Sequence, residues 1–408
     1  MSKIKITDFG PIKRGLTKND GWLDVKGVTV FIGNQGSGKS TVAKVISTLA
    51  WIEKAINRGD LNVKEFTINS FTSYFQFQKI QNYFTSSTYI EYIGDKFHIL
   101  FDASKKKLQF KEIENSQYIV PQIMYVPSER NFLSTISDAF NVKGLPDNVF
   151  AFAGELKRAQ NEFKGKKIDL PINGYSYEYD SGEDSSYVSG DNYRIRLLEA
   201  SSGLQSFIPL YLVTRNLSIS INERQKKDSN EMSVTQAMRL ANELKAILED
   251  SKITEKEKAE KSAKIRSRYM NKCFINIVEE PEQNLFPHSQ WNMLKCLLKY
   301  KNLNTGNKLL ITTHSPYLVN YLSIAIQSDF LKGKIQSEQQ KSRLEEIIPL
   351  NATVSPGDIG IYQFDEKTGE IKHLPDYEGI PTDKNYLNES LYQGNELFDK
   401  LLELEQEL

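Results

Sequence analysis

The chain has 408 residues, of which 39% are hydrophobic and 25% are charged, and its 52 basic side chains are balanced by 52 acidic ones. This length allows a large core in two lobes, and a net charge of zero gives no global attraction to nucleic acid. The sequence has no basic start followed by an apolar run and no stretch of about 18 apolar residues, so we expect a cytoplasmic protein with no membrane partner. Two cysteines are too few for a disulfide framework, and no Cys/His cluster has zinc-ligand spacing.

A strand, a glycine-rich loop and a helix are predicted close to the N-terminus. Residues 22–32 favour a strand, residues 41–56 have helical spacing of apolar residues, and the loop between them fits G-x-x-x-x-G-K-[ST]. Such glycines let backbone N–H groups surround a phosphate, while Lys39 neutralises the β- and γ-oxygens and the Ser40 hydroxyl ligates Mg²⁺. The sequence therefore predicts binding of a nucleoside triphosphate with Mg²⁺. The residues expected to bind it are Gly33, Asn34, Gln35, Gly36, Ser37, Gly38, Lys39, Ser40 and Thr41.

The next segments predict strands outside the nucleotide sheet and then a charged helical region. Residues 89–113 alternate and turn twice, at 94–95 and 103–104, which predicts an antiparallel meander, and residues 175–200 predict two strands around an acidic loop. Residues 221–272 are rich in charge and helix-forming, which predicts a helical insertion. Its part 252–272 has eight basic and three acidic residues. One face of this part is thus a candidate for contact with nucleic acid phosphates or an acidic partner, and a solvated helix is the alternative.

Two further strands end in polar residues that suit hydrolysis. Residues 274–278 read as a buried parallel strand followed by Glu279 and Glu280, which places both carboxylates where ligands of open α/β sheets bind. We expect Glu279 to hold Mg²⁺ through water and Glu280 to polarise the attacking water, against the alternative of a solvated acidic turn. Residues 309–311 form the second strand, and His314 after it is expected near the γ-phosphate, unless it is a satisfied core histidine.

The order of these motifs resembles the ATP-binding-cassette (ABC) ATPases of the RecF, SMC and overcoming-lysogenization type, within the AAA family ATPases. In those families a signature L-S-G-G-Q of one subunit completes the ATP site of the other, and residues 201–205 (SSGLQ) line up with it. The resemblance implies that Ser202, Gly203 and Gln205 bind nucleotide. The alternative is that this segment is an ordinary cap of the helix that follows it. Leu204 departs from the second glycine of the signature. Glu279 stands where the family usually has aspartate.

The resemblance also implies the fold and the domain organisation. We expect an α/β P-loop NTPase of the ABC-type ATPase head, with an antiparallel β subdomain and a helical insertion. A single domain, 1–408, would form two lobes from three segments. These are 1–135 (P-loop and antiparallel β), 136–272 (helical and signature, with insertion 221–272) and 273–408 (carboxylate strand, switch histidine, C-terminal hairpin and helix).

Two segments leave their roles open. The strand 122–126 is followed by Glu129 and Arg130, which either sense the nucleotide or neighbouring subunit or form a turn ion pair. Residues 356–380 predict a closing hairpin. The terminal helix places Leu397, Leu401, Leu404 and Leu408 on one stripe, suited equally to packing on its own domain or to docking on another chain.

The sequence thus predicts an ATPase that uses ATP and Mg²⁺, with Lys39, Glu280 and His314 as catalytic residues, and that works as a homodimer or higher homo-oligomer. Its strings VPSERN, EEPEQNLFP and THSPYLV look like those of ATPase subunits of bacterial anti-phage systems such as Septu, PARIS or retron-linked relatives. This similarity implies a separate nuclease or toxin effector as partner. A DNA-repair or chromosome-handling ATPase that binds DNA directly is the alternative, and a transporter subunit is a more distant one.

Overall fold

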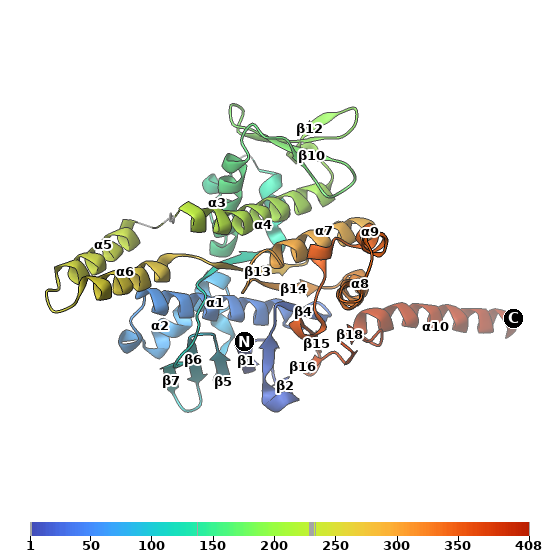
Figure 1. The fold of residues 1–408 in the computed structure, drawn as a ribbon. Coiled ribbons are helices and arrows are strands. Elements are labelled where there is room, and N and C mark those ends of the chain that lie inside the picture. Colours follow the sequence, from blue (N-terminus) through green and yellow to red (C-terminus); the bar gives the residue numbers. More distant parts are fainter. Residues whose placement is uncertain (1, 137, 228–231, 233, 408) are drawn as a thin grey trace.

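The structure, a computed structural model, describes residues 2–136, 138–227, 232 and 234–407. Its centre is a seven-stranded main sheet with the strand order β2-β16-β15-β4-β14-β13-β8 (Figure 1). The five strands from β15 to β8 are parallel, and β16 is antiparallel to β15. The strands are β2 (Gly15–Leu16), β4 (Val28–Gly33), β8 (Pro121–Val126), β13 (Cys273–Glu279), β14 (Lys308–Thr313), β15 (Ile359–Phe364) and β16 (Glu370–His373).

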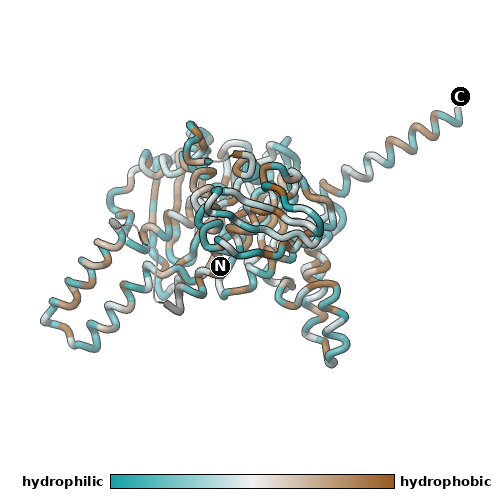
Figure 2. The backbone as a smooth tube through the Cα atoms, turned by 90° about the horizontal axis from the view of Figure 1, so that it is seen from above, coloured by the Kyte–Doolittle hydropathy of each residue, from teal (hydrophilic) through white to brown (hydrophobic). Residues whose placement is uncertain are grey.

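The central strands are apolar because both faces of the main sheet are covered. On β4, Val28 and Val30 contribute to one core cluster and Phe31 to the other, as the alternation of side chains along a strand requires. Figure 2 shows brown, hydrophobic segments running through the body. The first cluster lies under α3 (Asp147–Glu162), α4 (Ser202–Lys227), α7 (Pro287–Lys301) and α8 (Pro316–Lys332), and the second lies around α1 (Lys39–Arg58).

A five-stranded antiparallel sheet of order β3-β1-β5-β6-β7 completes the second core. Its strands are β1 (Ser2–Phe9), β3 (Leu23–Val25), β5 (Phe84–Ile93), β6 (Phe97–Asp102) and β7 (Lys107–Glu112). The predicted meander is confirmed as β5, β6 and β7, with both turns as expected. Strand β1 was not predicted from the sequence, and its alternating burial places it between β3 and β5.

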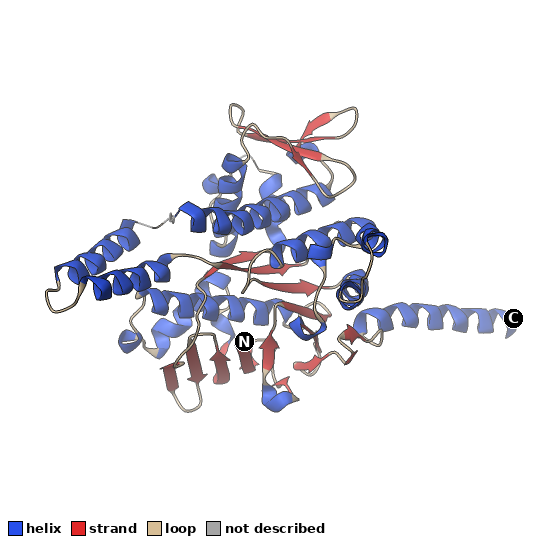
Figure 3. Cartoon of the chain, viewed as in Figure 1, coloured by secondary structure: helices blue, strands red, loops and turns tan. Residues whose placement is uncertain are grey.

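The remaining elements lie around this body (Figure 3). A sheet of order β12-β11-β10-β9 contains the two predicted strands around an acidic loop. Most of the described residues of the predicted insertion 221–272 are helical, although its start differs, because α4 continues to Lys227. The other elements are β9 (Ile168–Asp169), β10 (Ser176–Asp180), β11 (Ser185–Ser189), β12 (Arg194–Arg196), β17 (Asp376–Tyr377), β18 (Ile380–Pro381), α2 (Ile68–Ser73), α5 (Val234–Glu249), α6 (Glu255–Tyr269), α9 (Glu338–Ile347) and α10 (Tyr386–Glu407).

The predicted fold class is confirmed: an α/β fold with a P-loop between a parallel strand and a helix, an antiparallel β subdomain and a helical insertion. The predicted closing hairpin is formed by β15 and β16. The division into three segments stays a prediction, and the main sheet draws β2, β4 and β8 from the first segment and β13 to β16 from the third. Among the described helices, none combines the length and the apolar character that a membrane span requires.

Candidate active site

The glycine-rich loop joins the end of β4 to the start of α1 at Lys39. Gly38 has a φ of 101°, and a Cβ atom there would lie 2.4 Å from Cδ1 of Ile12, so glycine is required. Gly36 also has a positive φ, but a Cβ atom there would meet open space. The loop therefore keeps room on its open side, which suits a phosphate bound by the backbone N–H groups at the start of α1.

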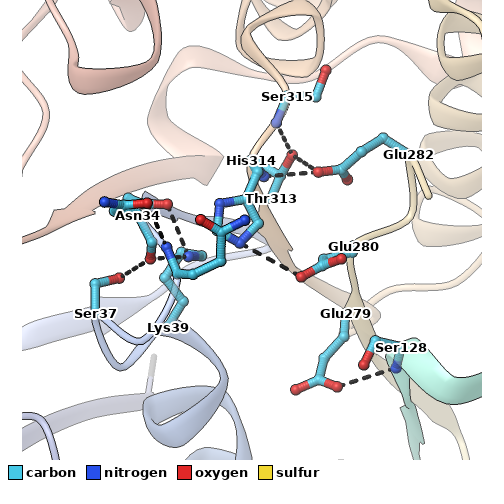
Figure 4. Close-up of polar contacts among 12 residues, drawn as sticks. Asn34, Ser37, Lys39, Ser128, Glu279, Glu280, Glu282, Thr313, His314 and Ser315 are labelled. Atoms are coloured by element: carbon cyan, nitrogen blue, oxygen red, sulfur yellow. Dashed lines mark hydrogen bonds and ion pairs between the residues drawn. The ribbon is translucent and has the colours of Figure 1, made fainter. Parts of the chain in front are cut away.

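Lys39 is turned into this loop (Figure 4). Its Nζ donates hydrogen bonds to the carbonyl oxygens of Gly33, at 2.9 Å, and Asn34, at 2.8 Å, and the side chain is buried. Burial lowers the pKa of Lys39 to about 8, although nearby carboxylates oppose the shift. Ser37 is buried and donates to the Asn34 carbonyl, while Ser40 is half-buried. A buried ammonium that donates to carbonyl oxygens would gain further from an anionic ligand.

The parallel register brings the three predicted catalytic residues to one edge. Glu279 on β13 pairs with Thr312 on β14, and Thr313 pairs with Ile32 on β4. These three strands therefore end together. The loop that carries Lys39, the turn that carries Glu280 and the segment that carries His314 meet there, as Figure 4 shows.

Glu280 follows β13 with a φ of +41°, a left-handed conformation that is uncommon for a glutamate. Its Oε1 lies 3.5 Å from Nε2 of His314. The contact with His314 lowers the pKa of Glu280 below its usual value, and the charges of Lys39 and Arg130 add to this effect. Glu280 is therefore ionised at neutral pH and can accept a hydrogen bond from water.

Glu279 points away from Glu280 and is buried. Its carboxylate accepts hydrogen bonds from the Tyr125 hydroxyl and from the Ser128 backbone N–H, and Nζ of Lys44 lies 3.8 Å away. A carboxylate has about four acceptor positions, so Glu279 retains capacity for a water on Mg²⁺. The described residues contain no group of three or more His, Cys, Asp or Glu side chains that could hold a metal by themselves. A hydroxyl and a carboxylate supply the oxygen ligands that Mg²⁺ prefers when phosphates and waters complete its shell.

Glu282 is a site residue that was not predicted from the sequence. It accepts hydrogen bonds from Oγ1 of Thr313 and from the backbone N–H of His314, both at 2.7 Å, and burial raises its pKa. The side chain thereby connects the turn after β13 to the end of β14 and to His314, which follows that strand directly. The sequence signal for Glu282 was its position two residues after Glu280, and this position does not predict hydrogen bonds to Thr313 and His314.

The signature-like segment lies at the start of α4. Ser202 is the first residue of α4 and is exposed, whereas Gly203 is buried, and a Cβ atom there would lie 2.7 Å from the carbonyl oxygen of Asn284. Nε2 of Gln205 donates to the carbonyl oxygens of Leu197 and Leu198, so this amide is engaged within the chain. Among the described residues, no hydrogen bond or ion pair joins 201–205 to the loop 33–41 of the same chain.

Arg130 connects this helix start to the carboxylate strand. It is fully buried, and its guanidinium donates to the carbonyl oxygens of Ser206, Glu279, Glu280 and Pro127. Burial lowers the pKa of Arg130 to about 10, so the group stays charged at neutral pH. The expectation of a turn ion pair is wrong for Arg130, because its partners are main-chain oxygens. This placement also argues against direct nucleotide sensing by Arg130, because its side chain is fully buried.

Comparison with known proteins finds no matching family model and no matching curated protein. Among solved structures, SMC heads and ABC cassettes are similar to this chain. The SMC head domain from Thermotoga maritima has 10% identity and a TM-score of 0.42, with 92% of this chain and 98% of that chain covered. The Smc head domain with an extended coiled coil, bound to the C-terminal domain of ScpA, from Pyrococcus furiosus has 10% identity and a TM-score of 0.36, with 98% and 100% covered. The dimeric, post-hydrolysis ATP-binding cassette MJ0796 bound to ADP and Pi has 10% identity and a TM-score of 0.30, with 92% and 100% covered. At these scores the function has to be inferred from the chain's own residues.

Proposed function

We propose that this protein is an ABC-type ATPase that binds and hydrolyses ATP with Mg²⁺. The observation that carries the proposal is the meeting of the glycine-rich loop, Glu280 and His314 at the carboxyl ends of β4, β13 and β14. The buried Lys39 and the open loop suit the triphosphate, and the ionised Glu280 suits the attacking water. These are the two requirements of phosphoryl transfer to water that a protein must supply.

Each side chain has a separate role in this proposal. Lys39 neutralises the β- and γ-phosphate oxygens, Glu280 accepts a hydrogen bond from the attacking water and aligns it, and His314 hydrogen-bonds the γ-phosphate. Ser40 and, through water, Glu279 would hold Mg²⁺, which supplies charge neutralisation between the β- and γ-oxygens. Glu282 is a positioning residue, because it accepts a hydrogen bond from the backbone N–H of His314 and thereby holds that residue in place.

The ATP site is proposed to be completed by a second copy. Ser202 is exposed at the start of α4, where the helix dipole and free N–H groups favour an anion. The start of α4 packs closely on the turn after Glu280 at Gly203, and Arg130 hydrogen-bonds both to α4 and to Glu280. Within the described part of the chain, no hydrogen bond or ion pair joins 201–205 to the loop 33–41. We therefore propose that Ser202 and Gly203 of one copy face the γ-phosphate held by the other copy.

The test uses Glu280→Gln, which should bind ATP, hydrolyse it slowly and accumulate as an ATP-bound dimer. Adding Ser202→Arg should abolish the ATP-dependent increase in association, measured by analytical ultracentrifugation with and without ATP, while ATP affinity per chain stays within about twofold. Equal ATPase rates in wild type and Glu280→Gln would refute the role of Glu280. Loss of ATP affinity in the Ser202→Arg chain would instead place Ser202 in the site of its own chain.

We further propose that the ATPase controls a separate nuclease or toxin in bacterial anti-phage defence. This proposal rests only on the similarity of the strings VPSERN, EEPEQNLFP and THSPYLV to those of ATPase subunits of such systems. Direct DNA handling is the second candidate, because α6 and its flanks carry eight basic and three acidic residues and most of α6 is exposed. ATPase assays with and without duplex DNA at 50 and 200 mM salt separate the two. Only direct DNA handling predicts stimulation that falls steeply with salt.

A further inference from the structure

Among its described side chains, the C-terminal helix α10 contacts the body at its first turn, where residues 386–388 are partly buried, and the later ones are exposed. The Asn385 side chain accepts hydrogen bonds from the backbone N–H groups of Leu387 and Asn388, and the Tyr386 hydroxyl donates to Asp365 at 2.9 Å. From there the helix leaves the body, as Figures 1 and 2 show. A helix of this length extends about 33 Å. Of the two alternatives for the terminal stripe, packing on its own domain is therefore wrong for the described residues.

The free part of α10 carries a continuous apolar stripe. Leu397, Leu401 and Leu404 are 62%, 63% and 52% exposed and are spaced by four and three residues, and Phe398 beside them is 60% exposed. Leu408, the fourth predicted member, lies outside the described residues. Such a repeat is the seam of a helix that packs against another helix. An exposed apolar stripe of this size marks an interaction surface.

A second exposed seam lies on α5, in the helical insertion. Met238, Ala241, Lys245 and Leu248 follow one another at spacings of three, four and three residues, and all four are exposed. Met238 and Leu248 are 64% and 60% exposed. The other face of α5 packs on α6. The α5 seam and the α10 seam therefore share the same spacing of three and four residues, and the α5 seam includes one lysine, Lys245.

The negative charge of α10 favours a basic helix as its packing partner. Residues 386–407 contain six acidic side chains and one lysine, so two α10 helices side by side would repel each other. Residues 252–272, which include α6 next to α5, contain eight basic and three acidic side chains. The acidic α10 thus complements the basic α5–α6 hairpin. Figure 1 shows that the hairpin and α10 leave opposite ends of the molecule, so both seams cannot meet within one chain.

We propose that the α10 seam of one copy packs on the α5 seam of a second copy, beside the basic α6, and forms a three-helix contact. If two copies are related by a two-fold axis, the contact occurs twice, because opposite ends of the copies then face each other. This contact is distinct from the proposed shared ATP site. It needs no nucleotide, so it can be tested whether or not the ATP proposal holds.

Disulfide trapping tests the contact directly in nucleotide-free, full-length protein. Chains with Met238→Cys and chains with Leu401→Cys are purified separately, mixed and oxidised, with wild type as the control for Cys273 and Cys296. The contact predicts a cross-linked pair of one chain of each kind, in the mixture only. Gln406→Cys, on the opposite side of α10, should cross-link to Met238→Cys at least fivefold less.

The other outcomes overturn the proposal. Cross-linking of Leu401→Cys chains alone means that α10 pairs with α10, and cross-linking of Met238→Cys chains alone means that hairpins pair with each other. No cross-link in the mixture means that α10 is left for a different protein. As a second measurement, Leu401→Glu should weaken association of nucleotide-free copies at least tenfold in sedimentation, whereas Gln406→Glu, with the same charge change, should leave it within about twofold. Equal effects of the two variants would also contradict the proposal.

Discussion

Nη2 of Arg130 donates a hydrogen bond to the main-chain oxygen of Glu280 at a distance of 2.6 Å. The same guanidinium reaches the carbonyl oxygens of Glu279 and, from Nε, of Ser206 in the first turns of α4. One buried side chain therefore holds together the residue proposed to align water and the helix proposed to face the other copy's nucleotide. Movement of α4 on nucleotide binding would reach Glu280 through this contact.

Replacing Arg130 with methionine should separate this role from ATP binding. The change leaves buried carbonyl oxygens without donors, at about 1–3 kcal/mol each, so the free energy of unfolding should fall by about 3 kcal/mol or more. We expect the kcat for ATP hydrolysis to fall at least tenfold, while the dissociation constant for ATP stays within about threefold, because the loop 33–41 is untouched. Arg130→Lys keeps a charge and three donors and should recover part of both losses. Equal loss of kcat and ATP affinity would contradict the role.

The affinity for ATP should depend on pH through Lys39. Because the pKa of this group in the free protein is about 8, the ammonium is lost as pH rises above 8, and the neutral amine cannot neutralise phosphate. Binding should therefore be about tenfold weaker at pH 9 than at pH 7. Isothermal titration calorimetry at several pH values measures this. Lys39→Ala should bind weakly without the added pH dependence, and a flat profile in wild type would contradict the prediction.

The stability of the antiparallel β subdomain should depend on pH through Glu53. This carboxyl is buried on α1 and accepts hydrogen bonds from the N–H groups of Lys96 and Phe97, and burial raises its pKa from near 4.5 to about 7. A raised pKa means that the folded state holds the proton more tightly, so the free energy of unfolding should fall as pH rises from about 5 to about 8. The loss is about 3 kcal/mol at most.

Glu53→Gln keeps an acceptor for both N–H groups but cannot ionise. Its unfolding free energy, measured by urea denaturation at pH 5 and pH 8, should lack this part of the pH dependence. At pH 8 the variant should be more stable than wild type. A variant with the same pH dependence as wild type would show that Glu53 has an ordinary pKa in the folded protein.

The sequence predicted which residues come together at the carboxyl edge of the main sheet, because this prediction depends only on residues that are near one another in the chain. Glu280 and His314 each follow directly on an apolar strand, and Lys39 follows β4 after the glycine-rich loop. Because parallel strands end at one edge, predicting that these residues meet required no knowledge of distant contacts. The predicted meander likewise depended on turns between adjacent strands.

The parts that were missed depend on contacts between residues far apart in the chain. Arg130 reaches Ser206 and Glu280, and nothing in the VPSERN string shows that its partners are main-chain oxygens. The stripe of Leu397, Leu401 and Leu404 looks the same in sequence whether it packs on its own domain or projects into solvent. The boundary at 221 was missed because α4 changes from apolar to charged without a break.

Mixing two inactive variants tests the central claim, that one ATP lies between two copies, most directly. Lys39→Ala and Ser202→Arg should each be inactive alone, but a mixed pair has one site in which both the loop and the signature segment are intact. With random pairing in an equal mixture, half of the dimers carry one active site of two, so ATP hydrolysis should recover to about a quarter of the wild-type rate. A mixture that stays at the rate of the separate variants would contradict the shared site.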